Sequence, residues 1–341
     1  MRQVLIPRHG PPEVLAPRDA PDPRAGAGEV VIAVRAAGVN FADVMARMGL
    51  YPDAPPLPFA PGYEVCGRVH AVGSGVTTCA PGDRVVALTR FGGYATHVVT
   101  PAACVFRIVE GFGDIEAAAL PVNYLTALLA LYQIANVTEG ETVVIHGAGG
   151  GVGTAAVQLA RLRGATVIGT SSSSKHDAIR GLGASHTIDY RTENVFDEVR
   201  RLTNGRGADV ILDSIGGESF RSSYRLLAPL GRLVMCGVSS IAPGERRRLW
   251  PIVRTMTRMP RFKPLSLMNR NRGVFGINLA HLWDEHARLT QAMHLLLDEV
   301  NAGRLRMIVS RSFPLEEAAS AHRFLQARSN IGKVVLTVLR S

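Results

Sequence analysis

The first 120 residues alternate between short apolar runs and turn signals, which is the pattern of β-strands. Strands are predicted at Glu29–Val34, Val65–Val72 and Arg84–Leu88, with turns at Gly73–Gly75 and Pro81–Gly82 between them. A small antiparallel barrel suits such strands best, because closing the sheet leaves few unpaired strand edges.

The pattern changes after residue 115. Ile115–Leu131 has apolar residues at helical spacing, and strands then alternate with helices through short loops. The predicted strands are Thr142–His146, Thr166–Gly169, His186–Asp189, Ala208–Asp213 and Arg232–Cys236, and the predicted helices are Thr154–Arg163, Lys175–Leu182 and Val195–Leu202. This alternation is typical of a doubly wound parallel sheet of the α/β class. The strands predicted at Val274–Ile277 and Ile331–Leu339 belong to a tail too short for a domain, which should complete the first one.

Composition is that of a globular protein. The chain has 341 residues, of which 47% are hydrophobic and 19% charged, enough for two domains with sizeable cores. Its four cysteines form no CxxC pair, which argues against a disulfide framework or a zinc ribbon. We see no apolar leader at the N-terminus and no apolar run long enough to span a membrane, so we expect a cytoplasmic protein.

One segment indicates a cofactor. The apolar run Val143–His146 leads into the glycine-rich turn Gly147–Gly153, and a helix follows. Glycines permit a tight turn and let backbone N–H groups approach a pyrophosphate at the helix N-terminus. The spelling departs from GxGxxG, since the sixth position counted from Gly147 is Val152, so the flanking strand and helix strengthen the prediction.

The next strand runs into Ser171–Ser174 and Lys175, in the place where an NAD site needs Asp or Glu for the ribose hydroxyls. Hydroxyl donors and one cation, with no carboxylate in this loop, suit the 2′-phosphate of NADP(H). We therefore predict NADP(H) as the cofactor. The competing interpretation is a solvated serine loop with a surface lysine.

Three stretches are specific in combination: Gly38–Asp43 with Gly49–Pro52, Pro61–Glu64, and His146–Gly153. Together they resemble the medium-chain dehydrogenase/reductases, in the quinone oxidoreductase branch that includes the VAT-1 homologues. The resemblance implies a GroES-like β-barrel catalytic domain at 1–120 and 268–341, with a Rossmann domain inserted at 121–267. It also implies a homodimer joined at the Rossmann sheet edge, near Arg232–Gly237.

The resemblance also assigns cofactor residues. The 2′-phosphate contacts would be Ser171, Lys175 and Tyr190, with Arg328 arriving from the tail. The pyrophosphate contacts would be Gly150, Gly151 and Val152. The remaining cofactor residues would be Gly169, Ser214, Gly216, Gly237 and Ser239, with Thr126, Asn40 and Gly332 flanking the nicotinamide. The alternative interpretation of Tyr190 is an aromatic residue at the end of a strand. The alternative interpretation of Arg328 is a surface charge.

Zinc enzymes of this superfamily have Cys, His and Cys or Asp ligands at the positions of Asn40, Tyr63 and 121–122. None of the residues here is a competent ligand, so we predict no metal. Without a Lewis acid, the acceptor should already be electrophilic, as quinones and α,β-unsaturated carbonyls are. Asn40 and Asp43 are expected to orient the ribose and nicotinamide, and Tyr51 to donate a hydrogen bond or a proton to the developing oxygen anion. The alternative role of Tyr51 is packing, and the alternative role of Asp43 is to stabilise a turn.

Residues 246–272 are strongly basic, with nine Arg or Lys and no Asp or Glu, in a chain of formal net charge +10. Basic stretches that contain Trp can lie on anionic membranes, so 246–263 is a candidate for peripheral membrane contact. A linker packed on the protein and a lid over the substrate are the alternatives. We expect no nucleic-acid binding, because no binding fold or stacking platform is visible.

The leading hypothesis is an NADPH-dependent, zinc-independent oxidoreductase that transfers hydride to quinones or α,β-unsaturated carbonyls. A second hypothesis is a stand-alone enoyl-thioester reductase of polyketide or fatty-acyl metabolism, because such domains share the glycine-turn pattern and a basic patch would suit an acidic carrier protein. A third is a low-turnover NADPH- or lipid-binding protein associated with membranes.

Overall fold

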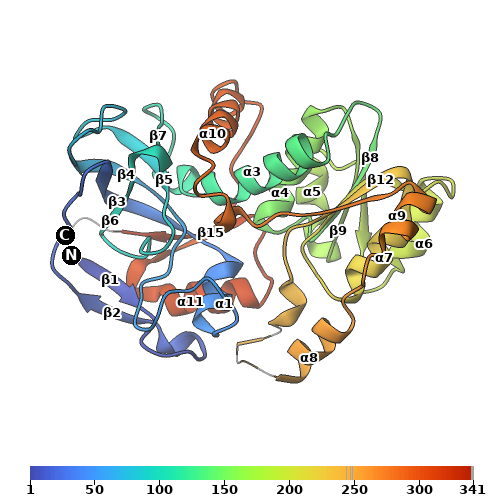
Figure 1. Ribbon diagram of the computed structural model, residues 1–341, viewed down its shortest axis with the longest axis horizontal. Coiled ribbons are helices and arrows are strands. Elements are labelled where there is room, and N and C mark those ends of the chain that lie inside the picture. Colours follow the sequence, from blue (N-terminus) through green and yellow to red (C-terminus); the bar gives the residue numbers. More distant parts are fainter. Residues whose placement is uncertain (243, 246, 248, 339–341) are drawn as a thin grey trace. The chain divides into compact units, whose positions relative to one another are not determined.

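The computed structural model describes residues 1–242, 244–245, 247 and 249–338, and it divides into two compact units. The first unit comprises Met1–Leu125, Gly244–Arg247 and Ala280–Ser341, and the second comprises Thr126–Pro243 and Arg248–Leu279. The chain therefore leaves the first unit, builds most of the second, and returns to finish the first, as the colours of Figure 1 show.

A mainly antiparallel sheet forms the first unit. Among the described residues it has seven strands, in the order β14-β15-β3-β4-β5-β7, with β6 pairing β3 off this path. The strands are β3 (Glu29–Val39), β4 (Glu64–Val72), β5 (Arg84–Leu88), β6 (His97–Pro101), β7 (Val105–Arg107), β14 (Val309–Pro314) and β15 (Lys333–Thr337), and β1 (Arg2–Leu5) and β2 (Ala16–Asp19) pair separately. The predicted β-rich unit is confirmed, although β1, β2, β6, β7 and β14 were not predicted.

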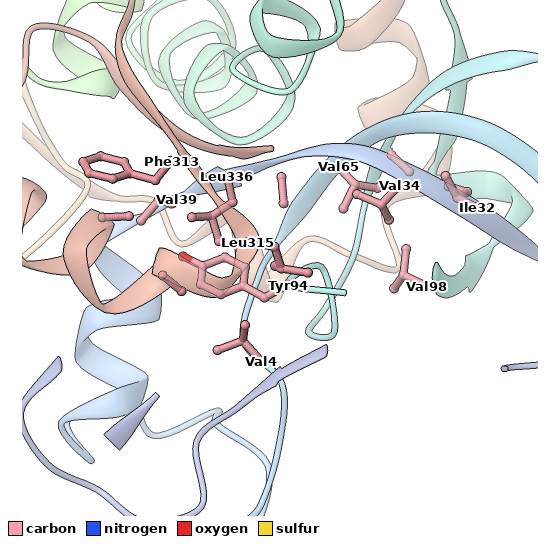
Figure 2. Close-up of a cluster of buried hydrophobic side chains, with 14 of the residues drawn as sticks. Val4, Ile32, Val34, Val39, Val65, Tyr94, Val98, Phe313, Leu315 and Leu336 are labelled. Atoms are coloured by element: carbon pink, nitrogen blue, oxygen red, sulfur yellow. The ribbon is translucent and has the colours of Figure 1, made fainter. Parts of the chain in front are cut away.

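The core of this unit is closed by the C-terminal strand. β15 lies antiparallel to β3 in a register that pairs Val334 with Val39 and Leu336 with Ala37. Figure 2 shows Leu336 and Val39 among the buried aliphatic side chains that surround Tyr94. Because Val334 pairs with Val39, the residues just outside this pair, Lys333 and Asn40, are brought to the same end of the two strands.

A parallel sheet forms the second unit. In the described part of the chain it has six strands, in the order β10-β9-β8-β11-β12-β13. The strands are β8 (Thr142–His146), β9 (Thr166–Ser171), β10 (His186–Asp189), β11 (Ala208–Asp213), β12 (Leu227–Met235) and β13 (Gly273–Gly276). The central strands are almost continuously apolar because helices cover both faces of a doubly wound sheet. The α/β class predicted from the sequence is confirmed.

The helices complete both units. They are α1 (Phe41–Arg47), α2 (Asp114–Ala117), α10 (His286–Asn301) and α11 (Ala318–Gln326) in the first unit, and α4 (Gly151–Leu162), α5 (His176–Gly181), α6 (Val195–Leu202), α7 (Glu218–Leu226), α8 (Leu249–Thr257) and α9 (Pro264–Arg270) in the second. Helix α3 (Pro121–Leu128) crosses the division and continues as a π-helical segment, Leu129–Ile134. The predicted helix Ile115–Leu131 is thus interrupted before Pro121, a residue favoured in the first turn of a helix.

Strand β13 differs from its expected place. It pairs with β12 from Arg232 opposite Gly273 to Met235 opposite Gly276, at the edge of the parallel sheet. The strand therefore belongs to the second unit, whereas the sequence analysis assigned 268–341 to the first. The expected dimer edge near Arg232–Gly237 also needs correction, because β12 lies between β11 and β13. A four-residue apolar strand carries no local signal of the sheet that it joins.

The packing of the glycine turn predicts a large difference between two glycine-to-alanine variants. A Cβ at Gly153 would lie 2.2 Å from the carbonyl oxygen of Gly147, whereas a Cβ at Gly181, in α5, meets nothing within 4 Å. Gly153→Ala should lower the free energy of unfolding by about 1–3 kcal/mol, because backbone must shift. Gly181→Ala should leave it unchanged or raise it by up to about 1 kcal/mol. Denaturant unfolding compares the two, and equal stability would contradict this packing.

Candidate functional site

A buried polar cluster lies at the start of α1, in the first unit. Asn40 is the N-cap residue of α1, and its backbone N–H donates to Asp43 Oδ2 at 2.8 Å in a capping box. Asp43 Oδ1 accepts the backbone N–H of Gly62, also at 2.8 Å. Asp43 thereby ties the start of the helix to the Pro61–Glu64 segment, two of the stretches that the sequence analysis singled out.

The same cluster contains a buried ion pair. The Lys333 ammonium donates to Asn40 Oδ1 at 2.6 Å and to Glu64 Oε1, with which it forms the ion pair. Glu64 Oε1 also accepts from Asn40 Nδ2 at 2.9 Å, and Oε2 accepts the Val122 N–H at 2.7 Å. Glu64 and Lys333 are 0% and 3% exposed, so each charge needs the other to offset the cost of its removal from water. Neither residue was predicted to have a role from the sequence, because their contact depends on the register of β15.

Burial dominates the electrostatics around Asp43. It raises the pKa of Asp43 to about 7, against the lowering effects of the Asn40 and Gly62 N–H groups and of Lys333. The hydroxyl of Tyr94 donates to Asp43 Oδ2 at 3.3 Å and lies 3.1 Å from His322 Nε2. Burial also raises the pKa of Tyr94 and lowers that of His322, so both stay neutral near pH 7. Since Tyr94 donates to Asp43, His322 Nε2 carries the proton and donates to Tyr94.

An aromatic group lies in the same unit, around the residue that precedes Glu64. The Tyr63 ring is 5.9 Å from Tyr51 and 5.0 Å from Phe91, and Phe91 is 5.4 Å from Phe59, measured between centroids. The edge-on and tilted geometries are those that aromatic pairs prefer. Burial raises the pKa of the Tyr63 phenol, which remains a donor. The ring of Tyr51, the predicted proton donor, is therefore part of this group of packed aromatic rings.

The cluster does not fit a zinc ion. Asn40 and Tyr63, at two of the zinc-ligand positions of zinc enzymes, offer a carboxamide and a protonated phenol in place of a thiolate and an imidazole. The Lys333 ammonium already occupies the oxygens of Asn40 and Glu64, and its charge repels a divalent cation. In the described ranges no group of three or more His, Cys, Asp or Glu is arranged to hold a metal ion.

The glycine turn is the first candidate-site feature of the second unit. Gly147 has a φ of +67°, which favours glycine, and Gly150 is the N-cap residue of α4. The Gly150 N–H bonds to Gly147 O at 2.9 Å, which closes the turn, and the Thr154 N–H makes the first bond of the helix, to Gly150 O. The N–H groups of Gly151 and Val152 precede it at the helix N-terminus, where an anion is stabilised.

Lys175 lies against this turn. A Cβ at Gly149 would fall 2.6 Å from Lys175 Cδ, so the lysine stem occupies the space that this glycine leaves open. Gly169 packs on the same turn, because a Cβ there would meet Ala148 Cβ at 3.0 Å. Tyr190, 42% exposed, is held by its N–H, which bonds to Ser171 O at 3.3 Å. The structure thus gathers these residues at the carboxyl ends of β8, β9 and β10.

Two details of the serine loop differ from expectation. The Ser171 hydroxyl is buried and donates its only proton to Ser172 O at 3.0 Å, so this proton is not available to a phosphate. A carboxylate also lies against the loop: Asp189 accepts the N–H groups of Arg191 and Ser173, which lower its pKa. This carboxylate was not predicted from the sequence of the loop, because Asp189 ends the neighbouring strand.

A second loop cluster adjoins the glycine turn. A Cβ at Gly147 would lie 3.3 Å from Ser214 Oγ, and one at Gly237 would lie 3.2 Å from Ser214 O. The Ser239 N–H bonds to Ser214 O at 3.0 Å, and Gly216 has a φ of +86° and meets Val238. The four residues predicted to line the adenosine and nicotinamide side are therefore together at the ends of β11 and β12.

A hydrogen-bond chain below these loops was not foreseen. His146 Nδ1 is 3.1 Å from the Thr170 hydroxyl, and Nε2 is 3.1 Å from the Ser223 hydroxyl, which donates to Asp213 Oδ2 at 2.7 Å. Because Ser223 donates to Asp213, it accepts from Nε2, which fixes the histidine tautomer. The chain joins the ends of β8, β9 and β11 and so braces the loops around the turn.

The other predicted residues fall in both units. Thr126, 7% exposed, is the first residue of the second unit. Arg328 and Gly332 belong to the first unit and have φ values of +56° and +77°. A Cβ at Gly332 would lie 2.1 Å from Ile308 O, so glycine is required immediately before Lys333.

Comparison with known proteins agrees with this architecture. Residues 26–110 match an alcohol dehydrogenase GroES-like domain, and residues 182–336 match a zinc-binding dehydrogenase domain. The human synaptic vesicle membrane protein VAT-1 homolog is 40% identical over 323 residues, 94% of this chain and 82% of that protein. Escherichia coli quinone oxidoreductase complexed with NADPH superposes with a TM-score of 0.88 at 28% identity, covering 99% of this chain and 100% of that one. CurK enoyl reductase gives a TM-score of 0.86 at 29% identity, covering 99% of both chains.

The chain belongs to the medium-chain dehydrogenase/reductase family and is an oxidoreductase with a GroES-like and a Rossmann unit. Within that family it is close to the VAT-1 homologues and the quinone oxidoreductase-like proteins. The name of the second matching domain refers to zinc, whereas the Asn40, Tyr63 and Lys333 side chains do not fit that ion.

The raised pKa of Asp43 predicts a pH dependence of stability. The folded protein binds this proton below about pH 7, and the unfolded chain only near the ordinary value of 3.8. Between these values the folded state holds the extra proton, so the contribution of Asp43 to stability decreases as pH rises toward 7. Asp43→Asn should remove this pH dependence and lower the free energy of unfolding by about 1–3 kcal/mol. The asparagine side chain has one acceptor oxygen, whereas the carboxylate offers two to the Asn40 N–H, the Gly62 N–H and the Tyr94 hydroxyl. Unfolding measured from pH 4.5 to 8, with exposed Asp284→Asn as control, tests this, and an unchanged slope in Asp43→Asn would contradict it.

Proposed function

We propose that the chain is an NADPH-dependent, zinc-independent reductase that transfers hydride to quinones or α,β-unsaturated carbonyls. The observation that carries the proposal is the placement of the Lys175 stem on Gly149, beside the N-terminus of α4. A pyrophosphate at the helix N-terminus and a 2′-phosphate at the lysine suit this pair of features. The NADPH complex of the E. coli quinone oxidoreductase supports the same cofactor.

The cofactor residues keep their predicted roles with one change. Gly150, Gly151 and Val152 surround the pyrophosphate, and the donors are the N–H groups of Gly151 and Val152 because the Gly150 N–H bonds to Gly147 O. Lys175, Tyr190 and Arg328 bind the 2′-phosphate. Ser171 is left without a side-chain donor for the phosphate, because its hydroxyl donates to Ser172 O. Ser214, Gly216, Gly237 and Ser239 line the dinucleotide, whereas Thr126, Asn40 and Gly332 serve the nicotinamide end. The Asp189 carboxylate accepts two backbone N–H groups, and these hydrogen bonds weaken its repulsion of a phosphate.

Bound NADPH supplies the hydride, and the residues of this chain orient the reactants and manage charge. Asn40 orients the nicotinamide, and Asp43 holds Asn40 through the capping box. Tyr51 donates a hydrogen bond or a proton to the oxygen on which negative charge develops. The aromatic group of Tyr51, Tyr63 and Phe91 excludes water and suits flat conjugated acceptors. An enoyl thioester is the competing acceptor, which the similarity to CurK enoyl reductase supports.

Assembly as a homodimer is part of the proposal. The edge strand β13 leaves one row of backbone groups without a partner strand among the described residues. Phe275 on this strand is 42% exposed. Pairing of two β13 strands would satisfy the edge and cover this ring.

Membrane contact is a second candidate function, favoured by one face of α8. Leu249, Trp250, Val253 and Met256 follow helical spacing and are 50–72% exposed. Arg254 and Arg258 lie on the same segment, whereas Arg246 and Arg248 fall outside the described residues. Such a face suits the headgroup region of an anionic bilayer. None of the helices in the described ranges is long and apolar enough to cross a membrane, so contact would be peripheral.

NADPH oxidation followed by absorbance tests the proposed reaction. Quinones, simple enones and crotonyl thioester are compared as acceptors, with NADH as the alternative donor. We expect turnover with quinones or enones above that with the thioester, and a preference for NADPH. Lys175→Ala should lower kcat/KM for NADPH about 10- to 100-fold, the cost of one charged hydrogen bond, and leave NADH unaffected.

Lys263→Ala is the matched control, because it removes a lysine far along the chain from the serine loop. NADPH binding without turnover of any acceptor would contradict the proposal that the chain is a reductase. Equal losses for NADPH and NADH in Lys175→Ala would remove the assignment of the 2′-phosphate site.

Vesicle co-sedimentation tests the membrane candidate. The protein should bind phosphatidylcholine vesicles that contain phosphatidylserine more strongly than vesicles without it. A double variant, Trp250→Glu with Met256→Glu, should lose this binding, because the helix face can no longer insert. Leu295→Glu, at a 47% exposed position on α10, serves as control. Unchanged binding of the double variant would rule out contact through α8.

A further inference from the structure

We propose that Lys333 is a positioning residue whose buried ammonium fixes the orientation of the Asn40 carboxamide. The ammonium places a cation beside a position where zinc enzymes of the superfamily have a metal ligand. The inference rests on the proposed function for the role of Asn40 at the nicotinamide. It concerns a side chain that sequence motifs did not single out, and it gives a role to the buried cation beside Asn40 and Glu64 in this chain.

The backbone determines where the ammonium lies. Gly332 has a φ of +77°, and any Cβ there would collide with Ile308 O. The Lys333 N–H bonds to Ile308 O at 2.7 Å, and the next residue, Val334, pairs with Val39 of β3. Lys333 is therefore held from both sides as the chain enters β15, and its 3% exposure shows that the ammonium does not reach solvent.

The contacts allow only one orientation of the Asn40 carboxamide. Its Oδ1 accepts from the Lys333 ammonium at 2.6 Å, and its Nδ2 donates to Glu64 Oε1 at 2.9 Å. A flipped amide would set its NH2 group against the ammonium and its oxygen against the carboxylate, two repulsive contacts. One lone pair of Oδ1 remains to orient a ligand, because the second N–H of Nδ2 donates to Gly38 O at 3.5 Å.

A simpler role for Lys333 is to neutralise Glu64. Removing the ammonium alone leaves a buried carboxylate without a counter-charge, which destabilises the fold whatever the role of Asn40. Replacing both charged residues separates the two roles. In Lys333→Met with Glu64→Gln, no charge is left uncompensated, but the Asn40 amide loses the cation that fixed its oxygen.

The experiment compares Lys333→Met, Lys333→Arg, the Lys333→Met/Glu64→Gln double variant and a Lys263→Met control. Thermal unfolding, NADPH affinity and kcat with the best acceptor are measured on each. The exchange rate of the Asn40 side-chain NH2 protons, followed by NMR in the cofactor-free protein and assigned with Asn40→Asp, gives a readout that needs no turnover.

We expect the double variant to recover wild-type thermal stability but not function. Its kcat should fall at least about 10-fold, the effect of losing one charge-assisted hydrogen bond, and its Asn40 NH2 protons should exchange at least about 10-fold faster. Lys333→Arg should keep part of the activity, because a guanidinium restores a cation. Lys263→Met should match the wild type.

Wild-type kcat and wild-type amide exchange in the double variant would overturn the proposal and leave Lys333 as a counter-charge only. Lys333→Met that folds and works like the wild type would overturn it as well. If the wild type reduces no acceptor, the proposed function fails, and the amide exchange of the double variant still decides whether Lys333 fixes Asn40.

Discussion

The first unit depends on the burial of one ion pair. A carboxylate and an ammonium taken out of water are tolerated only in contact with each other and with further hydrogen-bond partners. Glu64 and Lys333 are 269 residues apart in the chain, and the contact requires β3, β4 and β15 to meet at one point. The chain therefore cannot finish this unit before it has left it and returned. The same contact sets the Asn40 amide, so the architecture and the proposed chemistry share one constraint.

The second unit obeys a constraint of a different kind, the close approach of backbone to backbone. Gly153 packs against Gly147 and Ala148, which holds the first turn of α4 on the end of β8. The chain from Thr170 through His146 and Ser223 to Asp213 braces three strand ends below it. An anion site built from backbone N–H groups needs no side chain of its own, so the surroundings, Lys175 above all, decide which dinucleotide suits it.

Much of this follows from local sequence pattern, and the remainder depends on contacts between distant residues. β8, β10, β11 and α6 begin and end where the periodicity predicts, because each is a continuous apolar or amphipathic run. The short edge strand β13 was placed in the wrong sheet, because pairing partners are not local. Asn40, Asp43 and Lys175 were predicted from motifs, whereas the contacts of Glu64, Lys333 and Asp189 depend on strand register. The Pro61–Glu64 motif contained the signal for Glu64, and a lysine after the required Gly332 was the signal for its partner.

The most direct test of the central claim is an NMR spectrum of the protein labelled with ¹⁵N at the lysine side chains. The chain has only three lysines, Lys175, Lys263 and Lys333, so the spectrum is simple to assign. A buried, hydrogen-bonded Lys333 predicts one charged ammonium resonance whose protons exchange slowly with water at neutral pH and which disappears in Lys333→Met. Fast solvent exchange at all three lysines, or a neutral amine at Lys333, would contradict the buried ion pair on which this account rests.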